Sequence, residues 1–223
     1  MTSRDTRNRL VMLSLLLIGA VLLTRPATAA LTAQEIMDNA LQVYEEIDDY
    51  AAVVHTYAAD SLEASGSLFE QEPPQAAFNL FYRKPGEHAV QNIGGTSRGI
   101  FRVELLSSLE RFKTLELQLQ ANREPLRGQE CYVLEITDSE KPGTLARLWI
   151  SPRNWNVVQL TYFLNAIEFV RTQFHYAPGE RGPFLPVETR SLFPVSNRVL
   201  INRIANYEVN TGISPKLFER KNR

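Results

Sequence analysis

The catalytic motif in this sequence is Gly95-Thr96-Ser97-Arg98-Gly99, which fits the G-x-S-x-G pattern of a nucleophile elbow. In a serine hydrolase built on it, Ser97 would be the nucleophile, His175 the base, and an acid such as Asp138 the group that orients the base. His175 takes the second role because it is the only histidine after Ser97. The elbow belongs to a parallel sheet of repeated βα units, and the sequence shows no such repeat. We therefore predict that the protein is not an enzyme and keep the Ser97 hydrolase as an alternative.

Metal and redox chemistry find little support in the sequence. His55, His88 and His175 are far apart and lack ligand spacing, so no metal site and no cofactor are predicted. The single cysteine, Cys131, cannot form an internal disulfide. It lies in a strand pattern, where we expect a small buried apolar side chain. The fold must therefore be held by its apolar core.

The elements that would position these residues are mostly strands. The stretch from 129 to 176 holds short runs of β-branched, aromatic and aliphatic residues separated by brief loops, which join antiparallel neighbours. The same patterns along the chain predict strands at 50–57, 76–83, 89–93, 115–119, 129–137, 145–150, 157–162, 166–176, 187–193 and 199–209. We predict an α+β fold that is mainly β: one strongly curved antiparallel sheet with helices packed on one side.

Two helices are expected beside this sheet. Thr32 and Glu35 form a capping box, and apolar residues at helical spacing follow it, so the first helix is predicted over 32–48. Apolar residues from Phe101 to Phe112 recur at helical spacing and predict a second helix over 101–112. The segment 122–128 is interpreted as a turn.

The first 29 of the 223 residues are predicted to be a cleaved signal peptide. Arginines precede an apolar run over 10–23, and Ala27-Thr28-Ala29 is a small-x-small cleavage pattern. The apolar run is shorter than the roughly 20 residues that span a bilayer. Residues 30–223 would then form one domain with 20 basic and 24 acidic residues, a net charge of −4. Such a chain has no basic footprint for nucleic acid, so none is predicted as a partner.

Several strands are apolar on both faces. In 166–176, Ile167 and Phe169 point to one face while Val170, Phe174 and Tyr176 point to the other. A second layer of sheet, a concave face that holds an apolar ligand, and ordinary core packing all explain this pattern.

The mature chain resembles the LolA-like family of periplasmic outer-membrane lipoprotein carriers and their lipid-binding relatives. The resemblance lies in five stretches: LTAQEIMDNALQVYEEIDDYAAVVHTY (31–57), FYRKP (81–85), CYVLEI (131–136), LWISPRNW (148–155) and IANYEVNTGISPKLFE (204–219). It implies an unclosed β-barrel of roughly eleven strands, with helices covering its concave face and an apolar cavity for acyl chains. The family's carriers hold the helical lid with an arginine that binds backbone carbonyls, and the nearest candidate is Arg83. Segment 94–112 departs from the carrier pattern, which favours a divergent relative.

This resemblance implies a soluble, monomeric periplasmic carrier of an acylated lipoprotein or lipid. An inner-membrane transporter would supply the cargo and an outer-membrane acceptor would receive it. From the alternation of apolar residues we predict the lipid-binding residues Phe78, Leu80, Tyr82, Leu117, Tyr132, Leu134, Leu148, Ile150, Leu160, Tyr162 and Phe169, and the lid residues Phe101, Leu105 and Leu109. The alternative within the same fold is a lipid or lipoprotein sensor that regulates a membrane partner.

Overall fold

A computed structural model describes residues 30–64, 69, 72–95, 104–177 and 185–219. Within these residues the chain forms two α-helices, α2 (Ala33–Gln42) and α4 (Leu105–Phe112), and two short 3-10 helices, η1 (Pro194–Ser196) and η2 (Pro215–Leu217). The strands are β1 (Asp49–Ala59), β2 (Ala76–Arg83), β3 (Glu87–Gly95), β4 (Glu116–Leu119), β5 (Glu124–Leu126), β6 (Gln129–Thr137), β7 (Thr144–Ile150), β8 (Val157–Leu164), β9 (Ile167–Tyr176), β10 (Pro186–Phe193) and β11 (Arg198–Val209).

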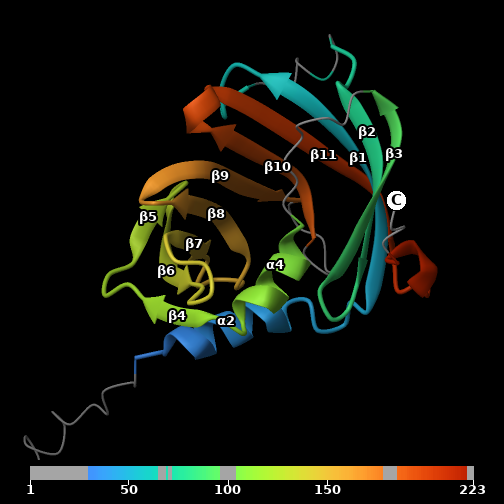
Figure 1. Cartoon of the computed structure of the whole chain (residues 1–223). Coiled ribbons are helices and arrows are strands. Elements are labelled where there is room, and N and C mark those ends of the chain that lie inside the picture. Colours follow the sequence, from blue (N-terminus) through green and yellow to red (C-terminus); the bar gives the residue numbers. More distant parts are fainter. Residues whose placement is uncertain (1–29, 65–68, 70–71, 96–103, 178–184, 220–223) are drawn as a thin grey trace, which may run out of the picture. The chain divides into compact units, whose positions relative to one another are not determined.

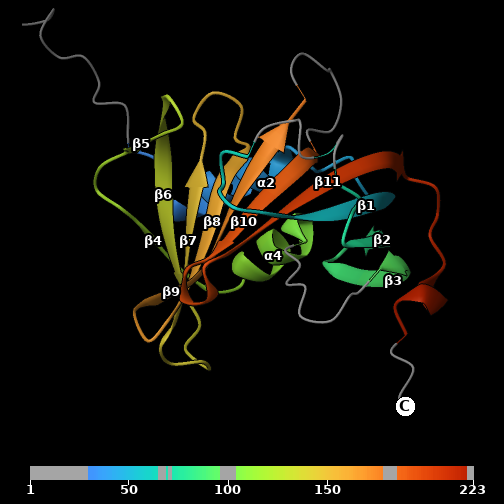
Figure 2. The ribbon, with the colours of Figure 1, turned by 90° about the horizontal axis from the view of Figure 1, so that it is seen from above.

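The strands form one antiparallel sheet that does not close on itself. Their order is β3-β2-β1-β11-β10-β9-β8-β7-β6-β4, and β5 pairs with β6 outside this path. β3 and β4 are therefore the two free edges. The sheet curves strongly, and α4 lies between strands β6–β9 on one side and β1–β3 on the other (Figures 1 and 2). This confirms the predicted mainly β fold with an open half-barrel and helices on its concave face.

The strands of the stretch 129–176 were predicted closely. β6 has the predicted bounds, and β7 to β9 differ from prediction by one or two residues at their ends. Outside this stretch, β2 also has its predicted bounds. Tight turns with positive φ, such as Asn165-Ala166 between β8 and β9, account for this precision because they fix where a hairpin reverses.

Three predicted elements need correction. α2 ends at Gln42, because the backbone from Val43 to Glu46 forms turns instead of continuing to residue 48. α4 begins at Leu105, since Glu104 is an extended N-cap, and not at residue 101. The predicted turn at 122–128 contains the short strand β5, which Pro125 and its three-residue length had concealed.

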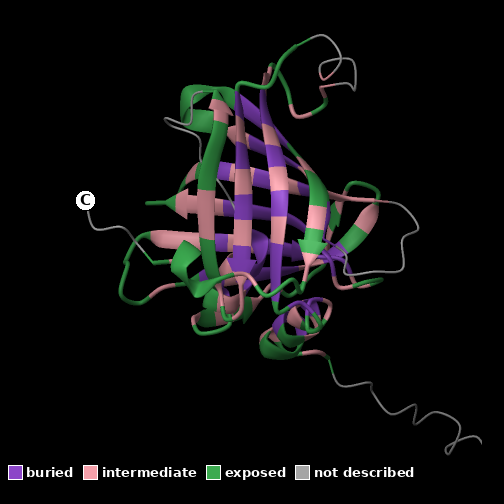
Figure 3. Ribbon diagram, turned by 90° about the vertical axis from the view of Figure 1, so that its right-hand side faces the viewer, coloured by how far each residue is buried: buried purple, intermediate pink, exposed green. Residues whose placement is uncertain are grey.

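The two apolar faces of the central strands have separate partners. On the outer face, Cys131, Val133, Trp149 and Val158 form a buried cluster, and Leu126 of β5 packs against it. The Trp149 indole N–H also donates to Glu124 Oε2 of β5 at 2.9 Å. β5 therefore extends the sheet beside β6, with its Leu126 side chain over the outer-face cluster, and Cys131 is the buried apolar side chain that the sequence predicted. Bands of buried and half-buried residues alternate along the strands in Figure 3.

Of the described residues, no helix is both long enough and apolar enough to cross a membrane. The predicted signal peptide, residues 1–29, lies outside the described part of the chain.

Candidate functional site

The two arms of the sheet carry large apolar side chains on its concave face. Direct cross-strand neighbours share a face of the sheet. By this rule Phe78, Leu80 and Tyr82 of β2 share a face with Val54, Ala52 and Tyr50 of β1. On the opposite arm the register pairs Leu134 with Leu148, and Leu148 with Leu160. Tyr50 and Tyr162 both contact α4 or its N-cap, so both arms present this face to the helix.

Ten of the eleven predicted lipid-binding residues belong to this concave face. Seven of them are buried: Phe78, Leu80, Tyr82, Leu134, Leu148, Ile150 and Leu160. Leu117, Tyr132 and Tyr162 are half-buried towards the β4 edge and the strand ends. Their role in lipid binding stays a prediction.

Phe169 is the residue that the prediction misplaced. Its side chain is 45% exposed, while its neighbour Val170 is fully buried and pairs with Tyr162. Val170, Thr172 and Phe174 alternate as the buried residues of β9, so Phe169 lies on the opposite face, and the prediction had chosen the wrong face of this strand.

α4 covers the concave face with four apolar residues. Leu105, Leu106, Leu109 and Phe112 are all buried, and the Phe112 ring lies 6.1 Å from the Tyr162 ring. Leu105 and Leu109, two of the three predicted lid residues, therefore lie on the helix that covers this face, and their role as a lid stays a prediction. The third of these, Phe101, lies outside the described residues.

The N-terminus of α4 is fixed by a buried carboxylate. Glu104 is 5% exposed, and it accepts hydrogen bonds from the backbone N–H groups of Leu106 and Ser107 and from the Ser107 hydroxyl. It also accepts one from the Tyr50 hydroxyl of β1. A carboxylate at a helix N-terminus is stabilised by the free N–H groups and by the helix dipole. Glu104 therefore both begins the helix and attaches it to the sheet.

Aromatic rings surround this carboxylate. The Tyr50 ring stacks on Tyr82 and meets Tyr207 edge-on, with both centroid distances at 5.4 Å. Burial and then the nearby charge of Glu104 raise the pKa of Tyr50 well above its usual value. The hydroxyl therefore stays protonated and remains a hydrogen-bond donor to Glu104 at any physiological pH.

The C-terminal end of α2 is attached to β9 through two tyrosines. The Tyr176 hydroxyl donates to the Val157 carbonyl at 2.8 Å, and the hydroxyls of Tyr44 and Tyr176 lie 3.4 Å apart. Because Tyr176 has already donated its one hydrogen, Tyr44 must be the donor in the second bond. Both side chains come from segments far apart in sequence, so this contact fixes the helix end on the concave face.

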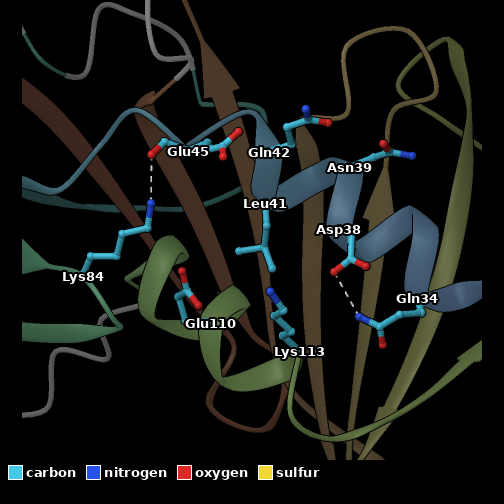
Figure 4. Close-up of a pocket in the computed structure, with 9 residues that line it drawn as sticks. All are labelled: Gln34, Asp38, Asn39, Leu41, Gln42, Glu45, Lys84, Glu110 and Lys113. Atoms are coloured by element: carbon cyan, nitrogen blue, oxygen red, sulfur yellow. Dashed lines mark hydrogen bonds between the residues drawn. The ribbon is translucent and has the colours of Figure 1, made fainter.

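A lysine, and not the predicted arginine, reaches the backbone of the lid. Lys84 Nζ donates to the Glu45 carbonyl at 2.9 Å, just after α2 (Figure 4). The Arg83 guanidinium instead pairs with Glu87 of β3 and stands 5.0 Å over the Phe218 ring. Alternation sends neighbouring side chains to opposite faces of a strand, so Arg83 points away from the helices.

Part of the concave face is polar. Five buried residues on β1, β9, β10 and β11 bond to one another in two groups: Thr172 with Ser191, and Thr56 with Asn202 and Thr189. Their hydroxyl and amide groups satisfy each other, which is the usual condition for burying polar atoms. An apolar ligand would therefore contact the two arms of the sheet rather than its middle.

Three cavities of the described chain lie away from the predicted lipid-binding residues of β2 and β6–β8. One of about 560 Å³ lies on the outer side of the helices and is lined by charged and amide residues of α2, α4 and the β2–β3 turn, Lys84 and Glu110 among them (Figure 4). One of about 260 Å³ is polar and includes His175, and one of about 270 Å³ lies near His55 and Arg203. Among the described residues, α4 covers part of the concave face with its buried apolar side chains.

The predicted hydrolase triad does not assemble. His175 lines a cavity with Gln129, the first residue of β6, whereas Asp138 follows the last residue of that strand. Nine residues of extended chain span about 30 Å, so Asp138 cannot orient His175. Asp138 instead binds Arg111 at 3.0 Å.

Ser97 itself lies outside the described residues, but the first glycine of its motif has a structural role. Gly95 ends β3 with a φ of +70°, and a Cβ there would lie 2.1 Å from the Gln75 carbonyl oxygen. The motif thus begins with a glycine that the fold needs. In the part of the chain that the structure describes, no cluster of three or more His, Cys, Asp or Glu residues could hold a metal ion.

Sequence reasoning missed the residues that fasten the helices: Glu104, Tyr50, Tyr44, Tyr176 and Lys84. One signal was present for Glu104, since an acidic residue directly before an apolar helical run is typical of an N-cap. The tyrosine pair gave no signal, because 132 residues separate its members.

Comparisons with known proteins agree with this geometry. No family model matches the sequence, and no curated protein matches it. A LolA superfamily protein from Nitrosomonas europaea is similar in structure, with a TM-score of 0.58 and 14% identity over 85% of this chain and 98% of that one. A domain assigned to outer membrane lipoprotein sorting, from Vibrio parahaemolyticus, gives 0.56 and 12% over 84% and 96%.

A DUF1329 family protein from Desulfovibrio piger gives a TM-score of 0.54 and 15% identity over 86% of this chain and 98% of that one. These matches span nearly the whole of each solved chain at identities that establish the fold alone. The protein has a LolA-like fold.

Proposed function

We propose that this protein is a periplasmic, non-enzymatic carrier that binds acyl chains of a lipoprotein or lipid against the concave face and moves them between the inner and outer membranes. The observation that carries the proposal is a concave face rich in large apolar side chains, which two short α-helices, α2 and α4, cover in the described part of the chain. A LolA-like fold, found also in a lipoprotein-sorting domain, supports it. Residues 1–29 would be the signal peptide that directs export.

Energetics favour α4 as the helix that moves. Burying a CH₂ group is worth about 0.8 kcal/mol, so a chain of about 15 such groups gains roughly 12 kcal/mol. Exposing the four apolar side chains of α4, at about 1.5–3 kcal/mol each, costs roughly 6–12 kcal/mol. One acyl chain can therefore replace α4. Releasing α2 as well would expose Ile36, Met37, Ala40, Tyr44 and Ile47, a cost that one chain does not offset.

The polar anchors of α4 lie near both of its ends: besides the Arg111–Asp138 ion pair near its C-terminus, two contacts hold its first turn. Glu104 joins its N-terminus to Tyr50, and the Ser107 hydroxyl lies 3.1 Å from His88 Nδ1 of β3. A monomer with this lid would accept cargo from an inner-membrane transporter and release it to an outer-membrane acceptor.

Native mass spectrometry of residues 30–223 purified from the periplasm tests this function. Acyl lipid or lipopeptide bound at about one per chain, identified after extraction, is the expected result. An apo mass that persists after incubation with lysophospholipid and with triacylated lipopeptide would contradict it. Purification of the same chain from the cytoplasm, without residues 1–29, controls for lipid acquired during lysis.

A further inference from the structure

A second, polar cavity lies at one end of the half-barrel. It occupies about 260 Å³ between the β5–β6 turn, the β7–β8 loop and the end of β9. Its polar walls are Arg127, Gln129, Ser151, Asn154, Asn156 and His175. Three amide side chains, a hydroxyl, a guanidinium and an imidazole thus face one small volume.

Two buried atoms in this cavity lack partners among the described residues: Asn156 Oδ1 and His175 Nε2. Asn156 is only 3% exposed. Arg127 Nη2 lies 2.9 Å from His175 Nδ1, and a guanidinium can only donate, so Nδ1 accepts and Nε2 carries the proton. Two residues of the cavity wall therefore contain one unpaired acceptor and one unpaired donor, and because both atoms are almost closed to solvent, a ligand would bond to them after the Asn156 and His175 side chains turn towards it. Burying such atoms without partners is unfavourable, and a ligand with complementary groups would recover that cost.

The charge of the cavity is positive. Arg127 donates to the Phe174 carbonyl at 3.2 Å and to His175, and none of the ion pairs between described residues includes it. Burial, together with the charges of Arg127 and Arg190, lowers the pKa of His175 to about 4, so the imidazole is neutral at pH 7. Arg127 is thus the charged residue among those that line the cavity, beside a neutral N–H donor, while the carboxylates of Glu188 and Glu63 also act on His175.

The backbone at Arg127 is unusual for this residue type. Arg127 and Gly128 form the two-residue turn between β5 and β6, with φ values of 51° and 76°. Turns of this kind favour Asn or Gly at both positions, because other side chains are strained at positive φ. Such strain clusters at ligand sites, where a particular side chain is required.

This cavity borders the concave face. Phe174 and Tyr176 form part of its wall, and the Tyr176 hydroxyl is bonded to Tyr44 at the end of α2. A molecule with a polar head and an acyl chain could place the head here and the chain under the helices.

We propose that this cavity binds a phosphate ester that carries a free hydroxyl group. The phosphate oxygens would accept from Arg127 and from His175 Nε2, and the hydroxyl would donate to Asn156 Oδ1. A phosphate fits better than a carboxylate because Gln129 and Asn154 add donors for a third oxygen. The ester could be a free polyol phosphate or the head group of a phospholipid, and the second source rests on the proposed function.

Calorimetry with two probes tests the proposal: sn-glycerol 3-phosphate, and lysophosphatidylglycerol below its micellar concentration. Two variants alter the cavity. Arg127→Asn keeps a residue that tolerates positive φ, and Asn156→Asp keeps the shape while adding a negative charge. Each should raise the Kd at least tenfold. Arg123→Gln is the matched control, because Arg123 lies on the same hairpin but stacks on Tyr132 outside the cavity.

The outcomes are distinct. Tight binding of glycerol phosphate supports a free ligand, and binding of lysophosphatidylglycerol alone supports a lipid head group. In either case Arg127→Asn must weaken the binding and Arg123→Gln must not. Binding of neither probe overturns the proposal. Equal binding of lysophosphatidylglycerol and lysophosphatidylcholine, unchanged by Arg127→Asn, also overturns it, while leaving acyl binding by the concave face intact. Uptake of neither lysolipid, with glycerol phosphate still bound, would instead contradict the carrier function.

Discussion

The Tyr50 hydroxyl of β1 donates a hydrogen bond to the Glu104 carboxylate, which at the same time caps the first turn of α4. This one contact joins the start of a lid helix to the strand beneath it. Because Glu104 is buried and its other hydrogen bonds go to the helix itself, the carboxylate transmits any change at Tyr50 directly to α4.

Substitution of Glu104 should therefore loosen α4. Glu104→Gln leaves a buried amide where a carboxylate accepted four hydrogen bonds, and we expect the free energy of unfolding to fall by about 1–3 kcal/mol. Acyl uptake should become faster, since the closed position of the helix is weakened. Urea denaturation and stopped-flow uptake of a fluorescent fatty acid measure the two effects.

The matched control for this change is Glu110→Gln on the same helix. Glu110 faces the outer cavity and not the sheet (Figure 4). It should change stability by no more than about 0.5 kcal/mol and leave uptake unaltered. Equal uptake rates in Glu104→Gln and Glu110→Gln would show that the cap does not restrain the lid.

Lys84 should restrain the end of α2, and Arg83 should not. Lys84→Met removes the donor to the Glu45 carbonyl, so the amides of residues 43–47 should exchange their hydrogens several-fold faster. Arg83→Gln, which breaks the pair with Glu87, should leave these amides unchanged. Hydrogen-exchange mass spectrometry makes the comparison, and faster exchange in Arg83→Gln alone would restore the arginine to the role first predicted for it.

Much of the fold could be predicted because local patterns determine it. Runs of apolar and aromatic residues in β2 and β6, with turn residues at their ends, gave both strands their bounds. β5 was not predicted because a strand of three residues is too short to show a periodic pattern. The start of α4 was misplaced because Phe101 continues the helical spacing of the apolar residues. The helix begins after Glu104, whose side chain caps the first turn by hydrogen bonds that spacing does not encode.

Stability should depend on pH through His175. Its pKa in the folded protein is about 4, against an ordinary value near 6.5, so between these values the unfolded chain binds a proton that the folded chain does not. Stability must therefore fall as pH decreases from about 6.5 to 4. The loss should be less than the roughly 3 kcal/mol of the full shift, because the ring is half-buried and partly screened.

His175→Gln should remove this part of the pH dependence while keeping a polar side chain in the cavity. Denaturation at pH 7 and pH 4.5 gives the comparison. An identical loss of stability in the wild type and in His175→Gln would assign the acid sensitivity to other groups.

The assignment of faces can be tested by truncating two apolar residues. Leu148 is fully buried under the helices, so Leu148→Ala should lower the free energy of unfolding by about 2–5 kcal/mol. Phe169 is 45% exposed, so Phe169→Ala should cost less than about 1 kcal/mol. Chemical denaturation measures both, and a larger loss in Phe169→Ala would reverse the assignment.

The concave-face residues were largely predictable, and the anchors of the lid were not. Alternation alone places Leu134, Leu148 and Leu160 on one face, because each strand of this sheet is regular there. The contacts between Tyr44 and Tyr176, and between Tyr50 and Glu104, join residues 132 and 54 positions apart. Such pairs depend on the curvature of the sheet, which no single segment specifies.

The most direct test of the account is to lock α4 onto the sheet. A Ser107→Cys, His88→Cys variant places two thiols where the native side chains lie 3.1 Å apart, and a short thiol cross-linker joins them. The buried Cys131, whose pKa is raised by burial, should not compete for the reagent. An Arg83→Cys, Glu87→Cys variant, cross-linked within the β2–β3 hairpin, is the control.

Uptake of lysophospholipid before and after cross-linking is the measurement. The α4 lock should reduce uptake at least tenfold, cleaving the cross-link should restore it, and the hairpin cross-link should have no effect. Full uptake with α4 locked would contradict the claim that acyl chains replace this helix on the concave face.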